Sequence, residues 1–193
     1  MKASKLTAKV YHEHIEHFGE PDKSIRFGGE PCVKGEEHIP SVIDIFVWQP
    51  DKDIDITTFS TIGMSDKPMN GVEYRAELHF AIRKNLHENE ISKISAFLAN
   101  LAVYPFLRDT FFDWYHILSN PLEIPNFKTA NTILFLPAFV ENGWDTIQFD
   151  KQTIKILNAV PITSVEKEIV KNEGVNALYS YFETEQIDIF TER

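Results

Sequence analysis

The stretch STIGMSDKPM (residues 60–69), followed closely by YRAEL (residues 74–78), decides how this chain is interpreted. β-Branched residues lead into a short polar loop, and a second segment with strand-like alternation follows the loop. Together with the apolar run at 42–48, residues 54–62 and 72–82 indicate three consecutive strands with short connections. Such connections favour an antiparallel meander over βαβ units.

Helical periodicity flanks these strands. We expect helices at residues 5–18, 88–103, 163–171 and 175–185, and further strands at 25–27, 114–118, 132–139 and 153–160. Gly19 is placed to end the first helix, Pro105 to end or kink the second, and Gly174 to separate the last two. The stretch TSVE (residues 163–166) is a capping box. The predicted fold class is α+β, a mixed, largely antiparallel sheet flanked by helices.

The composition indicates one domain, residues 1–193, with enough apolar residues for a core. The formal charge of −10 argues against a protein that binds nucleic acid, and it would attract a basic partner. A single cysteine, Cys32, excludes an internal disulfide. The N-terminal region has no apolar run typical of a signal peptide, and no stretch is apolar enough for a membrane span. We therefore expect a cytoplasmic protein without membrane contact.

The histidine-rich stretch HEHIEH (residues 12–17) resembles a metal site at first sight. The zincin pattern needs two histidines four positions apart with Glu directly after the first, and this stretch lacks that spacing. His14 and His17 are three positions apart and share a helix face, but a third ligand is not evident. We interpret the stretch as a solvated helix face and predict no metal and no cofactor.

The loop at residues 63–67 is not a nucleophile elbow, because the second Gly is absent and a strand follows it. A catalytic Ser65 would also need a histidine base, and His79 is the one nearby in sequence. We predict no catalytic residue. Two interpretations stay open: a β-turn in which Ser65 and Asp66 cap backbone groups, or a surface that binds a partner.

Two carboxylates lie inside strand-like segments. Glu77 should share a sheet face with Arg75 and His79, since alternate residues of a strand point the same way. It is either an ordinary structural pair with Arg75 or a half-buried carboxylate at a recognition surface. Asp44 lies within an apolar strand, so its charge must be paired or face solvent.

The order and spacing of these motifs resemble the suppressor of fused (SUFU) domain family. The similar segments are VIDIFV (42–47), residues 58–66, YRAEL (74–78), residues 98–101, SNPL (119–122) and residues 154–161. The chain departs from the family at residues 113–115, where DWY stands in place of a common Gly-His pair.

The resemblance implies a non-enzymatic, protein-binding α+β domain. Eukaryotic members regulate transcription factors of Hedgehog signalling and carry a second lobe, for which this chain has no room. Many bacterial members resemble immunity proteins that neutralise polymorphic toxins. The function that the resemblance implies is therefore an immunity protein that neutralises a toxin, and the negative charge of the chain suits a basic toxin domain. The alternatives are a regulatory module that binds its partner by strand addition and a hydrolase that uses Ser65 or a His14–His17 metal.

The family places its acidic partner contacts at two positions that correspond to Asp66 and Glu77. We expect Asp66 to be exposed, so that its replacement costs little stability. The oligomeric state stays open. The full set of predicted partner-binding residues is Gly63, Met64, Ser65, Asp66, Lys67, Glu77 and Asp44.

Overall fold

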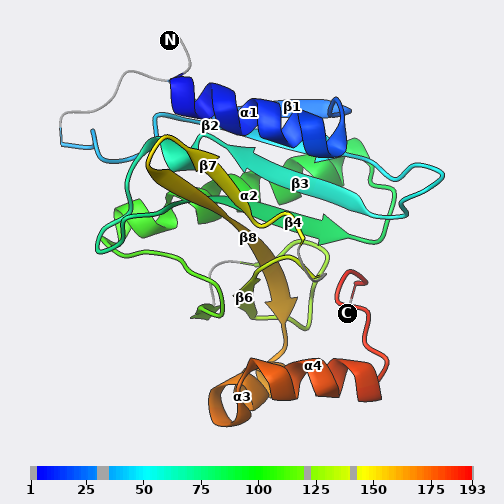
Figure 1. Ribbon diagram of the computed structural model, residues 1–193. Helices are drawn as coiled ribbons and strands as arrows, with labels where there is room; N and C mark the ends of the chain where they lie inside the picture. Colours follow the sequence, from blue (N-terminus) through cyan, green and yellow to red (C-terminus); the bar gives the residue numbers. More distant parts are fainter. Residues whose placement is uncertain (1–3, 30–34, 120–122, 140–142, 193) are drawn as a thin grey trace.

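The computed structural model describes residues 4–29, 35–119, 123–139 and 143–192, and it has the predicted α+β architecture (Figure 1). The helices are α1 (Lys5–Phe18), η1 (Met64–Asp66, a 3-10 turn), α2 (Glu88–Leu107), α3 (Ser164–Glu173) and α4 (Val175–Thr184). The strands are β1 (Lys23–Gly28), β2 (Val42–Trp48), β3 (Thr57–Ile62), β4 (Arg75–Ile82), β5 (Ile117–Ser119), β6 (Thr132–Leu136), β7 (Thr146–Phe149) and β8 (Gln152–Ile162).

The strands form one sheet in the order β1-β2-β3-β4-β8-β6-β5, and β7 also pairs with β8. The predicted meander is confirmed, because β1 to β4 pair with one another in antiparallel fashion. β8 then joins β4 in parallel, with Arg75 opposite Ile154. Long connections are needed for parallel neighbours, and residues 83–151 supply this one.

β6 and β7 lie one after the other along the same side of β8. Leu136 at the end of β6 pairs with Asn158, and Thr146 at the start of β7 pairs with Lys155. The chain between Leu136 and Thr146 therefore leaves the sheet and then rejoins it. The sequence predicted one strand over 132–139 and missed β7, which has only four residues.

The two faces of the sheet are covered differently. In β2, Ile43, Ile45 and Val47 belong to the core cluster that includes α2, whereas Phe46 and Trp48 pack in the cluster that includes α1. This separation follows from the alternation of side chains along a strand. Accordingly, α2 and α1 cover opposite faces of the sheet (Figure 1).

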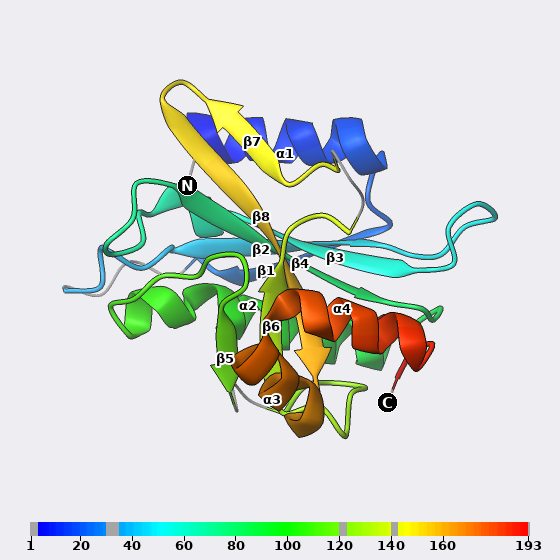
Figure 2. The same cartoon turned by 60° about the horizontal axis from the view of Figure 1, so that its bottom comes forward.

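β8 places α1 and the last two helices on the same face. Ile154 and Ile156 pack with α1, while Val160 and Ile162 pack with α4. All four have even numbers, so they point to one side of the sheet. The α3–α4 pair and α1 thus lie at opposite ends of this face, as both views show (Figure 1, Figure 2).

Several predicted boundaries need correction. α2 continues through Pro105 to Leu107, because a proline in the last turn removes only one intrahelical N–H bond. β3 begins at Thr57, since the carboxylate of Asp51 accepts the amides of Asp53 and Ile54 and forms a turn there. Cys32 and the SNPL turn at 119–122 fall wholly or mostly outside the described residues. Within the described ranges, no helix combines the length and apolar character that a membrane span requires.

Candidate partner-binding site

The side chain of Glu77 in β4 organises the loop that the sequence singled out. Its carboxylate accepts hydrogen bonds from the Thr61 hydroxyl (2.6 Å), the Ser65 hydroxyl (2.7 Å) and the amides of Gly63 (3.0 Å), Ser65 (3.0 Å) and Met64 (3.3 Å). Both oxygens are used, and every partner is a donor. Hydrogen bonds of this kind offset the free-energy cost of burying a carboxylate.

Burial raises the pKa of the Glu77 carboxyl to about 7, while the hydrogen bonds from Thr61 and Ser65 act to lower it. Removing a carboxylate from water always favours its neutral form. The donors around it favour the ionised form, because a protonated oxygen would need an acceptor. Glu77 thus holds the loop by electrostatic attraction to its amides and hydroxyls.

Gly63 allows the turn that points these amides inward. Its φ is +116°, and a Cβ at this position would lie 2.7 Å from the carbonyl oxygen of Val42. A side chain there would meet fixed backbone of β2, and L-residues rarely adopt this φ. Only glycine therefore fits between β3 and η1.

Asp66, at the end of the same loop, is exposed as predicted, but its carboxylate is engaged. It accepts hydrogen bonds from the hydroxyls of Ser4 and Thr7 (2.6 Å for Thr7) at the start of α1. Ser4 also caps this helix by accepting the Thr7 amide. A negative charge is favourable at a helix N-terminus. The expectation that replacing Asp66 costs little stability is therefore not supported by its surroundings.

Asp44 and Lys67 lie around this loop. The carboxylate of Asp44 is paired with the Arg26 guanidinium through two hydrogen bonds of 2.8 Å, which is one of the two alternatives expected for this charge. Lys67 donates to the carbonyl of Glu37 (2.5 Å). Arg75 donates to the Ser65 carbonyl (3.0 Å), so it supports the loop from the side.

The structure separates the predicted binding residues into two layers. Gly63, Met64, Ser65 and Glu77 are buried. Asp66 is exposed and Lys67 is partly exposed. Neither interpretation of Glu77 is confirmed: five donors enclose its fully buried side chain, and Arg75 donates to the Ser65 carbonyl instead. Any role of Glu77 in binding therefore goes through the loop that it holds.

His14 corrects the interpretation of HEHIEH as a solvated face. Its imidazole is fully buried, with Nδ1 2.7 Å from the Val10 carbonyl oxygen and Nε2 2.7 Å from the Ser60 hydroxyl and 3.0 Å from Nε2 of His79. A carbonyl only accepts, so Nδ1 of His14 carries the proton and Nε2 accepts. His14 continues the buried stripe of α1 that Leu6 and Val10 begin.

The ring pair is neutral. Burial lowers the pKa of His14 to about 4 and lowers the pKa of His79 well below its usual value. Burial disfavours a charged imidazole, and two adjacent rings disfavour it further. The pair is enclosed by aromatic rings, with the His14 ring centroid 4.8 Å from that of Trp144 and 6.4 Å from that of Trp48.

The residues that a hydrolase would need are not brought together in the structure. Ser65 is buried and donates to Glu77, whereas the ring of His79 faces His14. In the part of the chain that the structure describes, no group of three or more His, Cys, Asp or Glu side chains is placed to hold a metal ion. His14 and His17 come from the same helix, but Nε2 of His14 faces Ser60 and His79.

Sequence reasoning missed Ser4 and Thr7 as residues of this site. They lie 62 and 59 positions from Asp66, and no local pattern links them to it. The usual sign of a helix N-cap, a serine before the first turn, was present at Ser4. This signal predicts that Ser4 caps the helix, but it does not predict that Ser4 contacts the carboxylate of Asp66.

Comparison with known proteins adds one curated relative. The immunity protein YqcF of Bacillus subtilis (strain 168) is 27% identical over 176 residues, which cover 85% of this chain and 87% of the relative. The alignment therefore spans nearly all of both proteins.

The fold is shared with solved structures. A SUFU homologue from Neisseria gonorrhoeae superposes with a TM-score of 0.65 at 15% identity, over 97% of this chain and 94% of the other. A structure of the Sufu–Fu complex gives 0.65 at 14% identity (95% and 84%), and Drosophila Suppressor of Fused gives 0.61 at 12% (95% and 46%). The family described as Suppressor of fused protein (SUFU) matches residues 40–192, and the chain belongs to this family.

Proposed function

We propose that this chain is a cytoplasmic, single-domain immunity protein that binds and neutralises a protein toxin and catalyses no reaction. The observation that carries the proposal is the similarity to an immunity protein, YqcF, over most of both chains. The charge of −10 supports a basic toxin domain as the partner, because opposite charges speed encounter and favour the correct pairing.

A second candidate is a regulatory module that binds its partner by strand addition. The solved Sufu–Fu complex, whose fold this chain shares, favours a protein partner in this case too. β1 and β5 are the outer strands of the sheet, so each has one side on which an extended peptide could pair. The two candidates differ in what binding achieves: one blocks a toxin, and the other controls a regulator.

We propose the Gly63–Lys67 loop, with Asp44 beside it and Glu77 beneath it, as part of the binding surface. Asp66 and Lys67 supply the exposed groups, and Glu77 positions them from inside. A loop held by buried hydrogen bonds loses little conformational entropy on binding.

The test is co-expression of this chain with the polypeptide encoded directly upstream of its gene. We expect that polypeptide to stop bacterial growth, this chain to restore growth, and the two proteins to co-elute in size-exclusion chromatography. A toxic neighbour that this chain neither binds nor neutralises would contradict the proposal. Binding without toxicity would favour the regulatory module.

The loop is tested separately by calorimetric titration against the same polypeptide. Asp66→Asn removes the charge but keeps an acceptor oxygen for Thr7, and Thr7→Val weakens the tether but keeps the charge. We expect Asp66→Asn to weaken binding several-fold and Thr7→Val to leave it unchanged. Equal affinity for wild type and Asp66→Asn would show that the charge of Asp66 takes no part in binding.

A further inference from the structure

The face of the sheet between α1 and the α3–α4 pair carries an open cleft. Residues that continue the α1-facing rows of β3, β4 and β8 form its floor: Thr58, Ala81 and Asn158, with His79 at one side. No helix covers them, because α1 ends at Phe18 and α4 packs farther along β8. The cleft has a volume of about 480 Å³, within the range typical of ligand sites.

Aromatic rings and carboxylates surround this floor. Phe18 and Trp48 line the side nearest α1, and Phe139 and Phe190 line the side nearest the C-terminal segment. Phe139 is 45% exposed, and its ring meets that of Phe190 edge to face at 5.3 Å. Phe18 and Phe190 are partly buried and Trp48 is buried, so Phe139 is the exposed ring of the four. An exposed aromatic side chain beside a cleft is typical of binding surfaces.

The charged groups of the cleft have one sign. Glu20, Asp22 and Asp51 all line it and are exposed, whereas neither Lys nor Arg occurs among the described residues that line it. A cleft with carboxylates at its mouth and aromatic faces on its walls suits a cation on an apolar stem. It disfavours an anionic or a purely apolar ligand.

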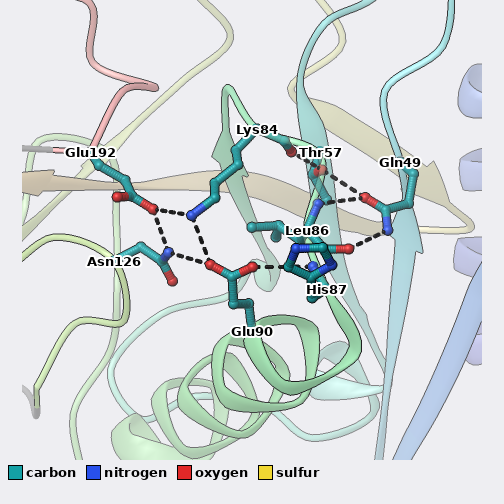
Figure 3. Close-up of polar contacts among 8 residues, drawn as sticks. All are labelled: Gln49, Thr57, Lys84, Leu86, His87, Glu90, Asn126 and Glu192. Atoms are coloured by element: carbon teal, nitrogen blue, oxygen red, sulfur yellow. Dashed lines mark hydrogen bonds and ion pairs between the residues drawn. The ribbon is translucent and has the colours of Figure 1, made fainter.

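The wall formed by Gln49 is held in place by a polar network (Figure 3). The side-chain oxygen of Gln49 accepts hydrogen bonds from the Thr57 hydroxyl (3.1 Å) and the Leu86 amide (3.2 Å), and its amide group donates to the Leu86 carbonyl (2.9 Å). Asp22 accepts the backbone amide of Gln49 (2.6 Å). This side of the cleft is therefore fixed before any ligand arrives.

The opposite wall is fixed through the C-terminal segment. The amide of Arg83 donates to the Phe190 carbonyl (2.7 Å), and its guanidinium pairs with Asp188 and Asp55. Lys84 joins Glu192 to Glu90 at the N-terminus of α2, each at 2.8 Å (Figure 3). These pairs hold Phe190 in the cleft wall. They also neutralise the two cations that lie nearest in sequence to the floor residue Ala81.

We infer that this cleft binds an arginine side chain presented by a basic loop of the protein partner. The guanidinium would stack on the aromatic walls and pair with the carboxylates of Glu20 and Asp22, because a planar, weakly hydrated cation makes both contacts at once. This inference rests on the proposed function, since it names the side of the molecule through which a protein partner is bound. The cleft lies at the C-terminal end of α1, and the Gly63–Lys67 loop lies at its N-terminal end.

The first experiment needs no partner. The blocked peptide acetyl-Gly-Arg-Gly-amide is titrated into ¹⁵N-labelled protein, with the same peptide containing citrulline as a neutral isostere. The indole N–H of Trp48, which donates to the Gly19 carbonyl (3.0 Å), serves as the reporter. We expect saturable shifts of Trp48 and its cleft neighbours with the arginine peptide alone. Equal shifts with both peptides, or shifts confined to other faces, would overturn the inference.

The second experiment uses the upstream-encoded polypeptide. Glu20→Gln with Asp22→Asn removes two charges and keeps an acceptor for the Gln49 amide. The matched control, Glu173→Gln with Asp150→Asn, makes the same chemical changes at exposed positions outside the residues that line the cleft. We expect about tenfold weaker binding for the cleft variant and no change for the control.

The outcomes separate the two proposals. Unchanged affinity of the cleft variant for a partner that wild type binds and neutralises would overturn the arginine site and leave the proposed function intact. Failure of wild type to bind or neutralise the polypeptide would overturn the proposed function, and the peptide titration would still decide the cleft.

Discussion

His14 and His79 face each other through their Nε2 atoms at 3.0 Å in the interior of the protein, one from α1 and the other from β4. The contact joins the helix to the central part of the sheet. Nε2 of His14 accepts and the ring of His79 donates, so the contact depends on a neutral His14, since an imidazolium cannot accept a hydrogen bond. Their ionisation is therefore linked to folding.

The first prediction concerns pH. The folded-state pKa of His14 is depressed to about 4 from an ordinary 6.5, so the unfolded chain binds the extra proton as pH falls through this window. Stability from this group is complete above about pH 6.5 and is lost toward pH 4, with about 2 kcal/mol gone at pH 5. Urea unfolding of wild type and His14→Gln at pH 7.5 and 5 should show a smaller acid loss in the variant.

A matched control is needed because Glu77 acts in the opposite sense. Its folded-state pKa is raised to about 7, so its contribution is present below its ordinary value and is lost as pH rises through 7. The difference between variants, rather than the wild-type curve, therefore isolates His14. His12→Gln, on the exposed side of α1, should keep the wild-type pH dependence. The same slope in all three proteins would contradict a neutral buried pair.

The second prediction concerns the loop that Glu77 holds. Glu77→Gln replaces one acceptor oxygen by an NH₂ group that faces donors, so the free energy of unfolding should fall by at least about 2 kcal/mol. Hydrogen exchange of the Gly63, Met64 and Ser65 amides should accelerate. Glu73→Gln, at an exposed position just before β4, is the control and should resemble wild type. Unaltered exchange at the three amides would show that Glu77 does not hold the loop.

The third prediction tests the tether between η1 and α1. Asp66→Ala removes the acceptor for the Thr7 hydroxyl and a charge at the helix N-terminus, and it should cost about 1 kcal/mol. Thr7→Val removes the other partner of the same hydrogen bond. In a double-mutant cycle the two losses should be less than additive, because each change breaks the same contact. Fully additive losses would mean that the two side chains are energetically independent.

The fourth prediction separates two costs of replacing a glycine: the strain of a positive φ and the steric clash of the added Cβ. Gly63→Ala combines an unfavourable φ of +116° with a Cβ placed 2.7 Å from the Val42 carbonyl oxygen. Gly35→Ala has a similar φ of +99° and open space around the new Cβ. Thermal melts should show a loss for both variants and a clearly larger loss for Gly63→Ala. Equal losses would mean that the backbone of β2 yields to the added methyl group.

The fifth prediction tests the core beneath α2. Leu98 is fully buried in the cluster between α2 and the sheet, on the same side of the helix as Ile91 and Ile94. Leu98→Ala should lower the free energy of unfolding by about 2–5 kcal/mol without changing the affinity for a partner. Leu107→Ala is the control, because Leu107 is 61% exposed at the end of the same helix. Wild-type stability of Leu98→Ala would contradict this packing.

The sequence predicted the parts of the fold that local patterns encode. β2 matches its apolar run from Val42 to Trp48, and α1 ends before Gly19 as expected. The meander was predicted because its strands follow one another with short connections, and the resemblance to the family rests on motifs in the same segments. β7 was missed because four residues are too few to show a clear alternation.

The candidate site was predicted less well, because its geometry depends on contacts between distant segments. Glu77 is buried because loop amides turn toward it, and their direction depends on the φ of Gly63. His14 was assigned to solvent because a histidine adds little to an apolar stripe. Its partners Ser60 and His79 lie 46 and 65 positions away in the sequence.

The central position of β8 has a consequence for the order in which the chain can fold. β8 pairs with β4 on one side and with β6 and β7 on the other, so it joins the meander to the rest of the sheet. Its residues 152–162 leave the ribosome late, after the whole meander has been made. Until then, the edge of β4 lacks its partner strand, and the apolar face of α1 lacks the part of its cover that Ile154 and Ile156 supply. Such segments are prone to wrong pairing, so the sheet gains its native order only after β8 has been made.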